Sequence, residues 1–370
     1  MSAPNGGQRL LWYVTSPNER CGIREYSNYL VSRLHLFGPG RGWACHAAWG
    51  SPEEVLEQLQ EGIVRAYTNA PAGTVPLCAF WLNHHAALHS AWTPAHLARV
   101  VELGFGVVVT QHDTFETRKI MDERSLPDFA RVSDVVVTHE AVEGYASHVL
   151  PQGVLPLPLS AGGPEEMLDA RPCVGTVGFD FPWKGFDDLV KAAKEAGWRV
   201  LILSNDMTDA RVRQLQELYP GGQVNVRVVR GWLSASRVVE QLAACDATAF
   251  LYSCGNSGTS GAIRLGIAAR RPVLAYRGCR QFRDLTHDPN EQLSINWCDS
   301  LRAVEDDLVM LATQRDYREG SIALVRALAD RHGLDKQATR YSELLTDAAQ
   351  RGWIRFAQKL QAATKAGARW

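Results

Sequence analysis

One stretch of the chain combines glycines with small hydroxyl side chains, a combination that can bind anions. An apolar run at 247–251 precedes it, and residues of helical composition follow at 260–270. The first amides of a helix have no partner within the helix, and the helix dipole adds positive charge there, so phosphates bind such ends. An ordinary capped helix is the alternative, because serine and threonine are common N-cap residues. The candidate anion ligands are Ser257, Gly258, Thr259, Ser260 and Gly261.

Polar loops follow several apolar runs in the first half of the chain. These loops are 16–22, 83–85, 112–114 and 138–140. The carboxyl ends of parallel strands meet at one edge of a sheet, and ligands of α/β proteins bind at that edge. A single histidine at a strand end is usually a structural, hydrogen-bonded residue. Four polar loops at one edge indicate a site more strongly.

Apolar runs alternate with amphipathic segments along most of the chain, which predicts helices between parallel strands. A stretch rich in proline and glycine interrupts the alternation before it restarts at Cys173. The expected fold class is therefore α/β with two Rossmann-like domains. The expected boundaries are a first domain at 1–157, a linker at 158–172, a second domain at 173–345 and a C-terminal helix at 346–370.

The composition is that of an ordinary soluble protein. The 370 residues are 46% hydrophobic and 21% charged, and their net charge of −1 gives no overall field that attracts nucleic acid or anionic lipid. The eight cysteines are scattered without a Cys-x-x-Cys pair, which indicates reduced thiols. No apolar run is long enough to span a bilayer, and the N-terminus shows no export signal. These features predict a cytoplasmic protein.

Several motifs resemble those of the family-4 glycosyltransferases of the GT-B fold, in their order and in their spacing. They include Trp183-Lys184-Gly185 after a glycine-containing strand end, and Arg271-Pro272-Val273 after the hydroxyl-rich loop. The resemblance covers about the whole chain. The segments that carry it are 21–27, 107–114, 175–193, 229–234, 245–246, 259–273 and 332–335.

This resemblance implies two Rossmann-like domains that face each other across a cleft. The first would hold the acceptor and the second a nucleotide-sugar, and the C-terminal helix would cross back to the first domain. The implied activity is a retaining, metal-independent transfer of a sugar. The nucleotide-sugar would be a co-substrate, no further cofactor is expected, and no protein nucleophile is assigned.

The resemblance also assigns roles to individual residues. Lys184 would neutralise the diphosphate of the donor together with the amides of 257–261, and Gly22 would let the N-terminal loop close over the same phosphates. A solvated lysine at a helix start is the alternative for Lys184, and a structural role is the alternative for each histidine. The residues assigned to the transferred sugar and the acceptor are His84, with His85 as its rival, His112 and Asp113.

The chain departs from the family pattern at three positions. Most members carry two glutamates that flank the glycine loop, and here Ser257 and the pair Arg264-Leu265 stand near those places. Phe179-Asp180 stands in the region of the arginine that accompanies the family's lysine. Recognition of the ribose and the sugar is therefore expected to differ, through Asn256, Ser257 or Arg264.

Two other functions remain open from the sequence. A GT-B-fold epimerase or phosphorylase would need acid and base groups, which Asp113, Glu116 and Glu140 could supply. A non-catalytic relative would keep the phosphate-binding loop without the glutamates. The acceptor is a glycan, a lipid-linked or a small molecule in the first interpretation, and nucleic acid is a remote alternative. The segment 351–370 is basic and amphipathic, which predicts a helix docked on the protein or a contact with a membrane surface.

Overall fold

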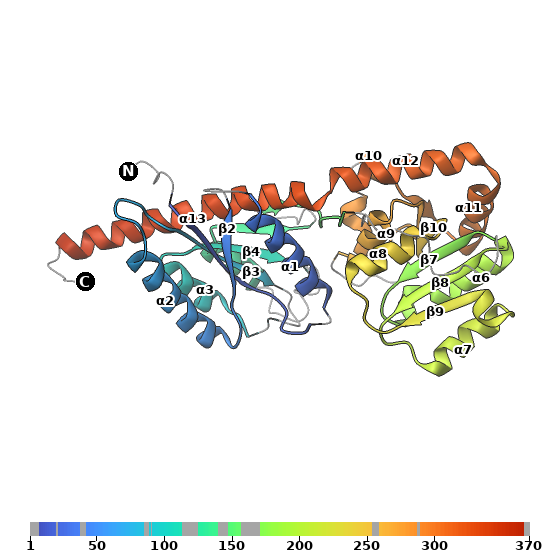
Figure 1. Ribbon diagram of the computed structural model, residues 1–370, viewed down its shortest axis with the longest axis horizontal. Coiled ribbons are helices and arrows are strands. Elements are labelled where there is room, and N and C mark those ends of the chain that lie inside the picture. The colour runs from blue at the N-terminus through green and yellow to red at the C-terminus, as the bar shows by residue number, and fades with distance from the viewer. Residues whose placement is uncertain are drawn as a thin grey trace. The chain divides into compact units, whose positions relative to one another are not determined.

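The protein consists of two compact units. One comprises Met1–Pro151 and Leu334–Trp370, and the other comprises Gln152–Gly333. The computed structural model in Figure 1 describes residues 7–19, 21–37, 42–84, 89, 91–112, 125–139, 147–156, 171–253, 259–286 and 289–365. Each unit is built on a 6-stranded parallel sheet with helices, so the predicted α/β class is confirmed.

The first unit has its strands in the order β2-β1-β3-β4-β5-β6, all parallel. The chain leaves β1 for β2 on one side and then continues from β3 on the other side, so the strand order reverses between β1 and β3. Ligands of doubly wound sheets bind at such a switch point. The strands are β1 Arg9–Val14, β2 Trp43–Ala47, β3 Leu77–His84, β4 Gly106–Gln111, β5 Val135–Thr138 and β6 His148–Val149. The helices are α1 Gly22–His35, α2 Pro52–Thr68, α3 Pro94–Glu102, α5 Ser125–Val132 and α13 Leu334–Lys365.

The central strands of this unit are buried on both faces. Every residue of β3 and β4 is buried, in agreement with the unbroken apolar runs of the sequence. The strand β3 extends to His84, whereas the apolar pattern ends at Leu82. His84 pairs with Gln111 in the ladder, so the partner strand carries β3 beyond its apolar run.

The long C-terminal helix α13 packs on the sheet of the first unit, against β3 and β4 (Figure 1). Glycines permit the close approach: a Cβ on Gly106 would meet the backbone of Ala348, and a Cβ on Gly352 would meet the backbone of Phe105 and Gly106. The buried hydroxyl of Tyr341 hydrogen-bonds with Thr110 Oγ1 at 3.1 Å. The C-terminal helix therefore returns to the first unit, and it begins at Leu334 rather than at the expected 346.

Basic side chains hold the second half of α13 to the same unit. The guanidinium of Arg355 donates to both carboxylate oxygens of Asp134, at 2.5 and 2.8 Å. Lys359 Nζ donates to the carbonyl oxygen of Glu102 at 3.3 Å. These contacts support the docked-helix interpretation of 351–365, while 366–370 lie outside the described residues. Among the described helices, none has the length and apolar character needed to cross a membrane.

The second unit has the strand order β12-β11-β10-β7-β8-β9, again all parallel. Counted from its own first strand β7, this is the strand order of the Rossmann fold, with the switch point between β7 and β10. The strands are β7 Cys173–Val177, β8 Arg199–Ser204, β9 Val226–Arg230, β10 Ala247–Phe250, β11 Val273–Tyr276 and β12 Asn296–Cys298. The helices are η1 Pro182–Lys184, α6 Phe186–Ala196, α7 Asp209–Leu218, η2 Gly222–Val224, α8 Ala235–Ala243, α9 Gly261–Ala268, η3 Arg280–Leu285, α10 Pro289–Gln292, α11 Leu301–Thr313 and α12 Arg315–Arg331.

Candidate functional site

Lys184 lies in the loop after β7, at the switch point of the second unit. Its side chain is 8% exposed, and its Nζ lies 3.8 Å from the ring centre of Tyr252 and 4.4 Å from that of Trp183. Both distances are those of cation–π contacts. Within the described part of the chain its ammonium makes no ion pair. A cation held by ring faces alone keeps its N–H donors, so Lys184 is available to an anion.

The loop of Lys184 is joined to the loop that follows β10. The amide of Ser253 donates to the carbonyl oxygen of Trp183 at 2.9 Å. Gly185 has a φ of +69°, and a Cβ there would collide with the carbonyl group of Leu251. The glycine after Lys184 is therefore required for the contact between the two loops.

Helix α9 begins directly beside this junction. Ser260 is its N-cap residue, yet the Ser260 hydroxyl donates to the Tyr252 hydroxyl at 3.3 Å and makes no capping hydrogen bond. The ordinary-cap alternative is thus wrong for Ser260, because its side chain does not bind the first amides of α9. Thr259 precedes this cap and Gly261 is the first helical residue. Asn256, Ser257 and Gly258 lie outside the described residues.

An exposed aromatic surface adjoins Lys184 where the family resemblance would place an arginine. Phe179 and Phe181 are 39% and 45% exposed, and the ring of Phe181 stacks on that of Trp183 with centres 5.4 Å apart. Asp180 does not face the lysine, because its carboxylate pairs with Arg211 of α7 at 3.2 Å. This aspartate therefore anchors the loop to its own unit.

Arg264 is buried within the second unit rather than exposed at the sheet edge. Its guanidinium is 3% exposed and pairs with the carboxylate of Asp284 on η3, which is 1% exposed. The Nε and Nη1 atoms of Arg264 have no hydrogen-bond partner among the described residues. The pair joins α9 to η3, and the predicted contact between Arg264 and the donor remains a prediction.

The first unit brings several histidines to the carboxyl edge of its sheet. His84 is the last residue of β3 and is fully buried, and its Nδ1 lies 3.0 Å from Gln111 Oε1. His112 follows β4, and its amide donates to the carbonyl oxygen of His84 at 3.1 Å. The structure therefore places His84 and His112 side by side at the sheet edge where the sequence analysis expected the polar loops to meet. His85 and Asp113 lie outside the described residues, as do Glu116 and Glu140.

His139 joins this group from the end of β5. Its Nε2 lies 3.0 Å from His112 Nδ1, and its Nδ1 lies 2.9 Å from the carbonyl oxygen of Leu150. The ring of Tyr26 stands almost perpendicular to both imidazoles, at 85° and 89°. The sequence marks the loop 138–140 as polar, but it gives no sign that His139 contacts His112.

Gly22 is the first residue of α1, at the edge where β1 ends. The N-cap residue Cys21 makes no side-chain capping bond. A Cβ added to Gly22 would meet nothing within 4 Å. Packing within the described residues does not require glycine here, so its predicted role next to a phosphate remains open to a direct test.

The chain is similar to known proteins in its three-dimensional structure, and the similarity is found among solved structures. No family model and no curated protein sequence matches the chain. HepE from Anabaena, solved with UDP and glucose, matches with a TM-score of 0.60 and 12% identity over 92% of this chain and 99% of that one. A glycosyltransferase from Rickettsia africae matches with a TM-score of 0.65 and 11% identity over 92% and 98%. A UDP-forming trehalose-phosphate synthase from Burkholderia xenovorans gives 0.58 and 8% over 92% and 99%.

The chain has the GT-B fold. Identities this low show the fold alone, so the resemblance to family 4 remains a resemblance. The sequence does not predict that the ammonium of Lys184 lies against two aromatic rings. Trp183 is its neighbour, but Tyr252 comes from another strand end, and the contact between Lys184 and Tyr252 has no local sequence signal.

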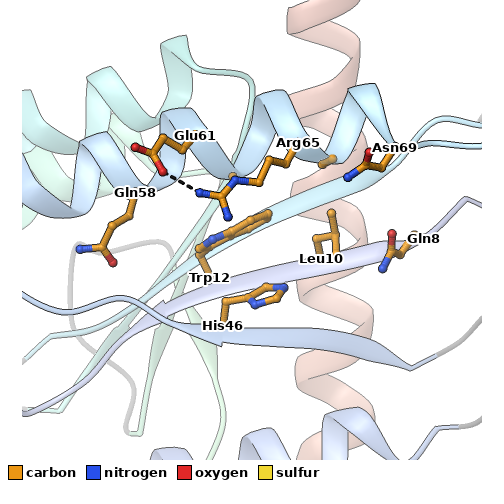
Figure 2. A pocket seen from close by; sticks show the side chains of 10 residues that line it. Gln8, Leu10, Trp12, His46, Gln58, Glu61, Arg65 and Asn69 are labelled. Carbon is orange, nitrogen blue, oxygen red and sulfur yellow. Dashed lines mark hydrogen bonds and ion pairs between the residues drawn. The ribbon is translucent and has the colours of Figure 1, made fainter.

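A pocket in the first unit of this GT-B chain lies apart from the predicted site residues. It has a volume of about 370 Å³ and lies between β1, β2 and α2. Figure 2 shows Leu10 and Trp12 beside it and the pair Glu61–Arg65, joined at 2.7 Å, across from them. None of the predicted site residues lines this pocket. Among the described residues, no group of three or more metal-ligating side chains has the geometry of a metal site.

Proposed function

We propose that the protein is a glycosyltransferase that moves a sugar from a nucleotide-sugar to an acceptor hydroxyl. The observation that carries this proposal is the ammonium of Lys184, which is buried between two rings, next to the N-terminus of α9. The diphosphate of a donor supplies the anion that such a site binds. The GT-B fold supports the proposal, as does the presence of UDP-glucose or of UDP and glucose in the HepE structures.

The chemistry follows from where negative charge develops. When the bond between the anomeric carbon and the phosphate oxygen breaks, the nucleoside diphosphate leaves with the electron pair. Lys184 and the first amides of α9 stabilise this charge, and in this proposal no metal ion is needed. The acceptor oxygen bonds to the anomeric carbon, and its proton passes to the departing phosphate oxygen. Attack and departure on the same face retain the configuration without a protein nucleophile.

The first unit provides the acceptor side in this proposal. His84 and His112 stand on adjacent strand ends near the switch point between β1 and β3. Both side chains are buried and hydrogen-bonded within the unit, His84 to Gln111 and His112 to His139. Their contact with the transferred sugar and the acceptor is what the family resemblance implies, and it is part of this proposal. His85 and Asp113 keep the roles that the resemblance implies for them.

A nucleotide-binding protein without transfer activity is the second candidate. The observation that favours it is Arg264, which stands near the place of a family glutamate and is paired inside the protein with Asp284. An epimerase or phosphorylase would rest on Asp113, Glu116 and Glu140. Release of nucleotide in the absence of any acceptor would favour that reaction over transfer.

Turnover with a panel of UDP-, GDP-, TDP-, ADP- and CMP-sugars tests the proposal. Mass spectrometry would follow the release of nucleoside diphosphate and the sugar that appears on candidate acceptors. We expect one donor to be selected and Lys184→Ala to lower kcat/KM by about 100-fold or more, as for loss of a charge-stabilising donor. Lys191→Ala on the exposed face of α6 is the matched control and should leave the rate unchanged. Tight binding of a nucleotide-sugar without turnover, with any acceptor class, would favour the non-catalytic candidate.

A further inference from the structure

The pocket between α2 and the strands β1 and β2 of the first unit is separate from the site described above, and we call it the α2 pocket. Its volume of about 370 Å³ falls within the range of small-molecule sites, about 300–1,000 Å³. Leu10 and Trp12 of β1 form its apolar part and are 6% and 8% exposed. Polar side chains of β2 and α2 surround them, as Figure 2 shows. The pocket thus combines a small apolar surface with a polar rim.

The indole of Trp12 is held in place by its neighbours. A Cβ on Gly62 of α2 would collide with the indole, so glycine lets the helix lie directly against the ring. The ring of Phe105 meets the indole edge-on, with centres 5.2 Å apart. Within the described part of the chain the indole N–H makes no hydrogen bond, although Trp12 is more than nine-tenths buried. A buried indole N–H usually has a partner, and a ligand oxygen in the α2 pocket can supply one.

Three side chains on the rim carry hydrogen-bonding groups that the protein does not use. Gln8, His46 and Asn69 are exposed, and no side chain or backbone group of the described residues hydrogen-bonds to their side chains. A carboxamide both donates and accepts hydrogen bonds, as does a neutral imidazole. The side chain of Gln58 is occupied instead, because its Nε2 donates to the carbonyl oxygen of Trp49 at 2.7 Å. The rim therefore offers donors and acceptors together.

The charged groups of the α2 pocket cancel each other. The guanidinium of Arg65 pairs with the carboxylate of Glu61 at 2.7 Å, so neither sign of charge is in excess. This balance disfavours a phosphate or another anion. One carboxylate and one imidazole among the lining residues are fewer ligands than a metal ion needs. A neutral sugar matches the lining, because its hydroxyl groups both donate and accept while the C–H groups of its ring are apolar.

We propose that the α2 pocket binds a neutral mono- or disaccharide. The indole N–H of Trp12 and the side chains of Gln8, His46 and Asn69 bind hydroxyl groups of the sugar, and Leu10 contacts its apolar face. This is a second sugar site, which contains none of the residues assigned to donor or acceptor and does not depend on transfer activity.

NMR of the full chain with ¹⁵N-labelled tryptophan tests the proposal directly. The probes are glucose, galactose, mannose, maltose, lactose and sucrose, and the indole signal of Trp12 is assigned with Trp12→Phe. We expect this signal to shift and to saturate with at least one of the sugars. Glucose 6-phosphate, which adds negative charge to one probe, should bind no more tightly than glucose.

Variants of exposed residues test the same site without altering the core. His46→Ala and Asn69→Ala should each weaken sugar binding about fivefold, as for the loss of one hydrogen bond. Gln60→Ala, which is exposed on α2 outside the pocket, is the matched control and should leave the affinity unchanged. If Trp12→Phe does not fold, the indole signal whose titration weakens in both rim variants identifies the site.

Four results would overturn the proposal. The first is the absence of a saturable indole shift with every sugar, and the second is unchanged affinity in both rim variants. The third is tighter binding of glucose 6-phosphate than of glucose. The fourth is loss of sugar binding in Lys184→Ala, which would place the sugar at the proposed donor site. A protein without transfer activity would leave all of these measurements intact.

Discussion

Glycine at position 185 is the single-residue feature on which the donor site depends most directly. It combines a φ of +69° with a position at which an added Cβ would collide with the Leu251 carbonyl group. Gly197 has a φ of +74° at the other end of α6, and a Cβ there would meet nothing within 4 Å. Gly197→Ala should cost about 1–2 kcal/mol from backbone strain alone. Gly185→Ala should cost about 1–3 kcal/mol more in urea unfolding and should weaken nucleotide binding. Equal costs for both variants would contradict the proposed contact between the loops.

Gly22 allows a test of the N-terminal loop that leaves stability aside. Because Gly22 is the first residue of α1 rather than an interior one, and a Cβ would meet nothing within 4 Å, Gly22→Ala should change the free energy of unfolding by less than about 0.5 kcal/mol. If this loop closes over the phosphates, the added methyl group should weaken binding of a nucleotide-sugar, measured by calorimetry. Unchanged affinity would remove Gly22 from the site.

At the scale of elements, the approach of α13 to β4 depends on two glycines. In most helices Gly→Ala stabilises by about 1 kcal/mol, and we expect this for Gly320→Ala in α12, where a Cβ meets nothing. Gly352→Ala should destabilise the folded protein instead, because the new methyl group would collide with the backbone of Phe105 and Gly106. Thermal unfolding of both variants measures this difference in sign. Stabilisation by Gly352→Ala would show that the helix packs farther from the strand.

At the scale of the whole molecule, the two units should differ in their ability to fold alone. The fragment 152–333 contains its complete sheet and helices. The fragment 1–151 lacks α13, whose buried Tyr341, Leu345 and Ala348 lie on the helix that packs against β3 and β4. We expect cooperative thermal unfolding for 152–333 and none for 1–151 unless 334–365 are also present. Cooperative unfolding of 1–151 alone would contradict this account of the helix.

The sequence predicted the two α/β units because long apolar strands and glycine-containing loops leave a clear local pattern. It also marked His84 and His112, because each lies at the end of an apolar run, and the family resemblance marked Lys184. It did not predict the cation–π partner Tyr252, the pairing of Arg264 with Asp284 or the contact between His112 and His139. Those contacts join residues from different strand ends or helices, so the strand order must be known before they can be seen. The short strands β6 and β12 contain too few residues to show a period.

The most direct test of the central claim is the thermal shift of the intact protein with the five classes of nucleotide-sugar. A ligand at about a hundredfold excess over its Kd stabilises the folded protein by about 2.7 kcal/mol. We predict a shift with one class, its loss in Lys184→Ala, and its retention in Lys191→Ala. A shift that persists in Lys184→Ala would place the nucleotide elsewhere, and the absence of a shift with every class would contradict a nucleotide-sugar site at Lys184.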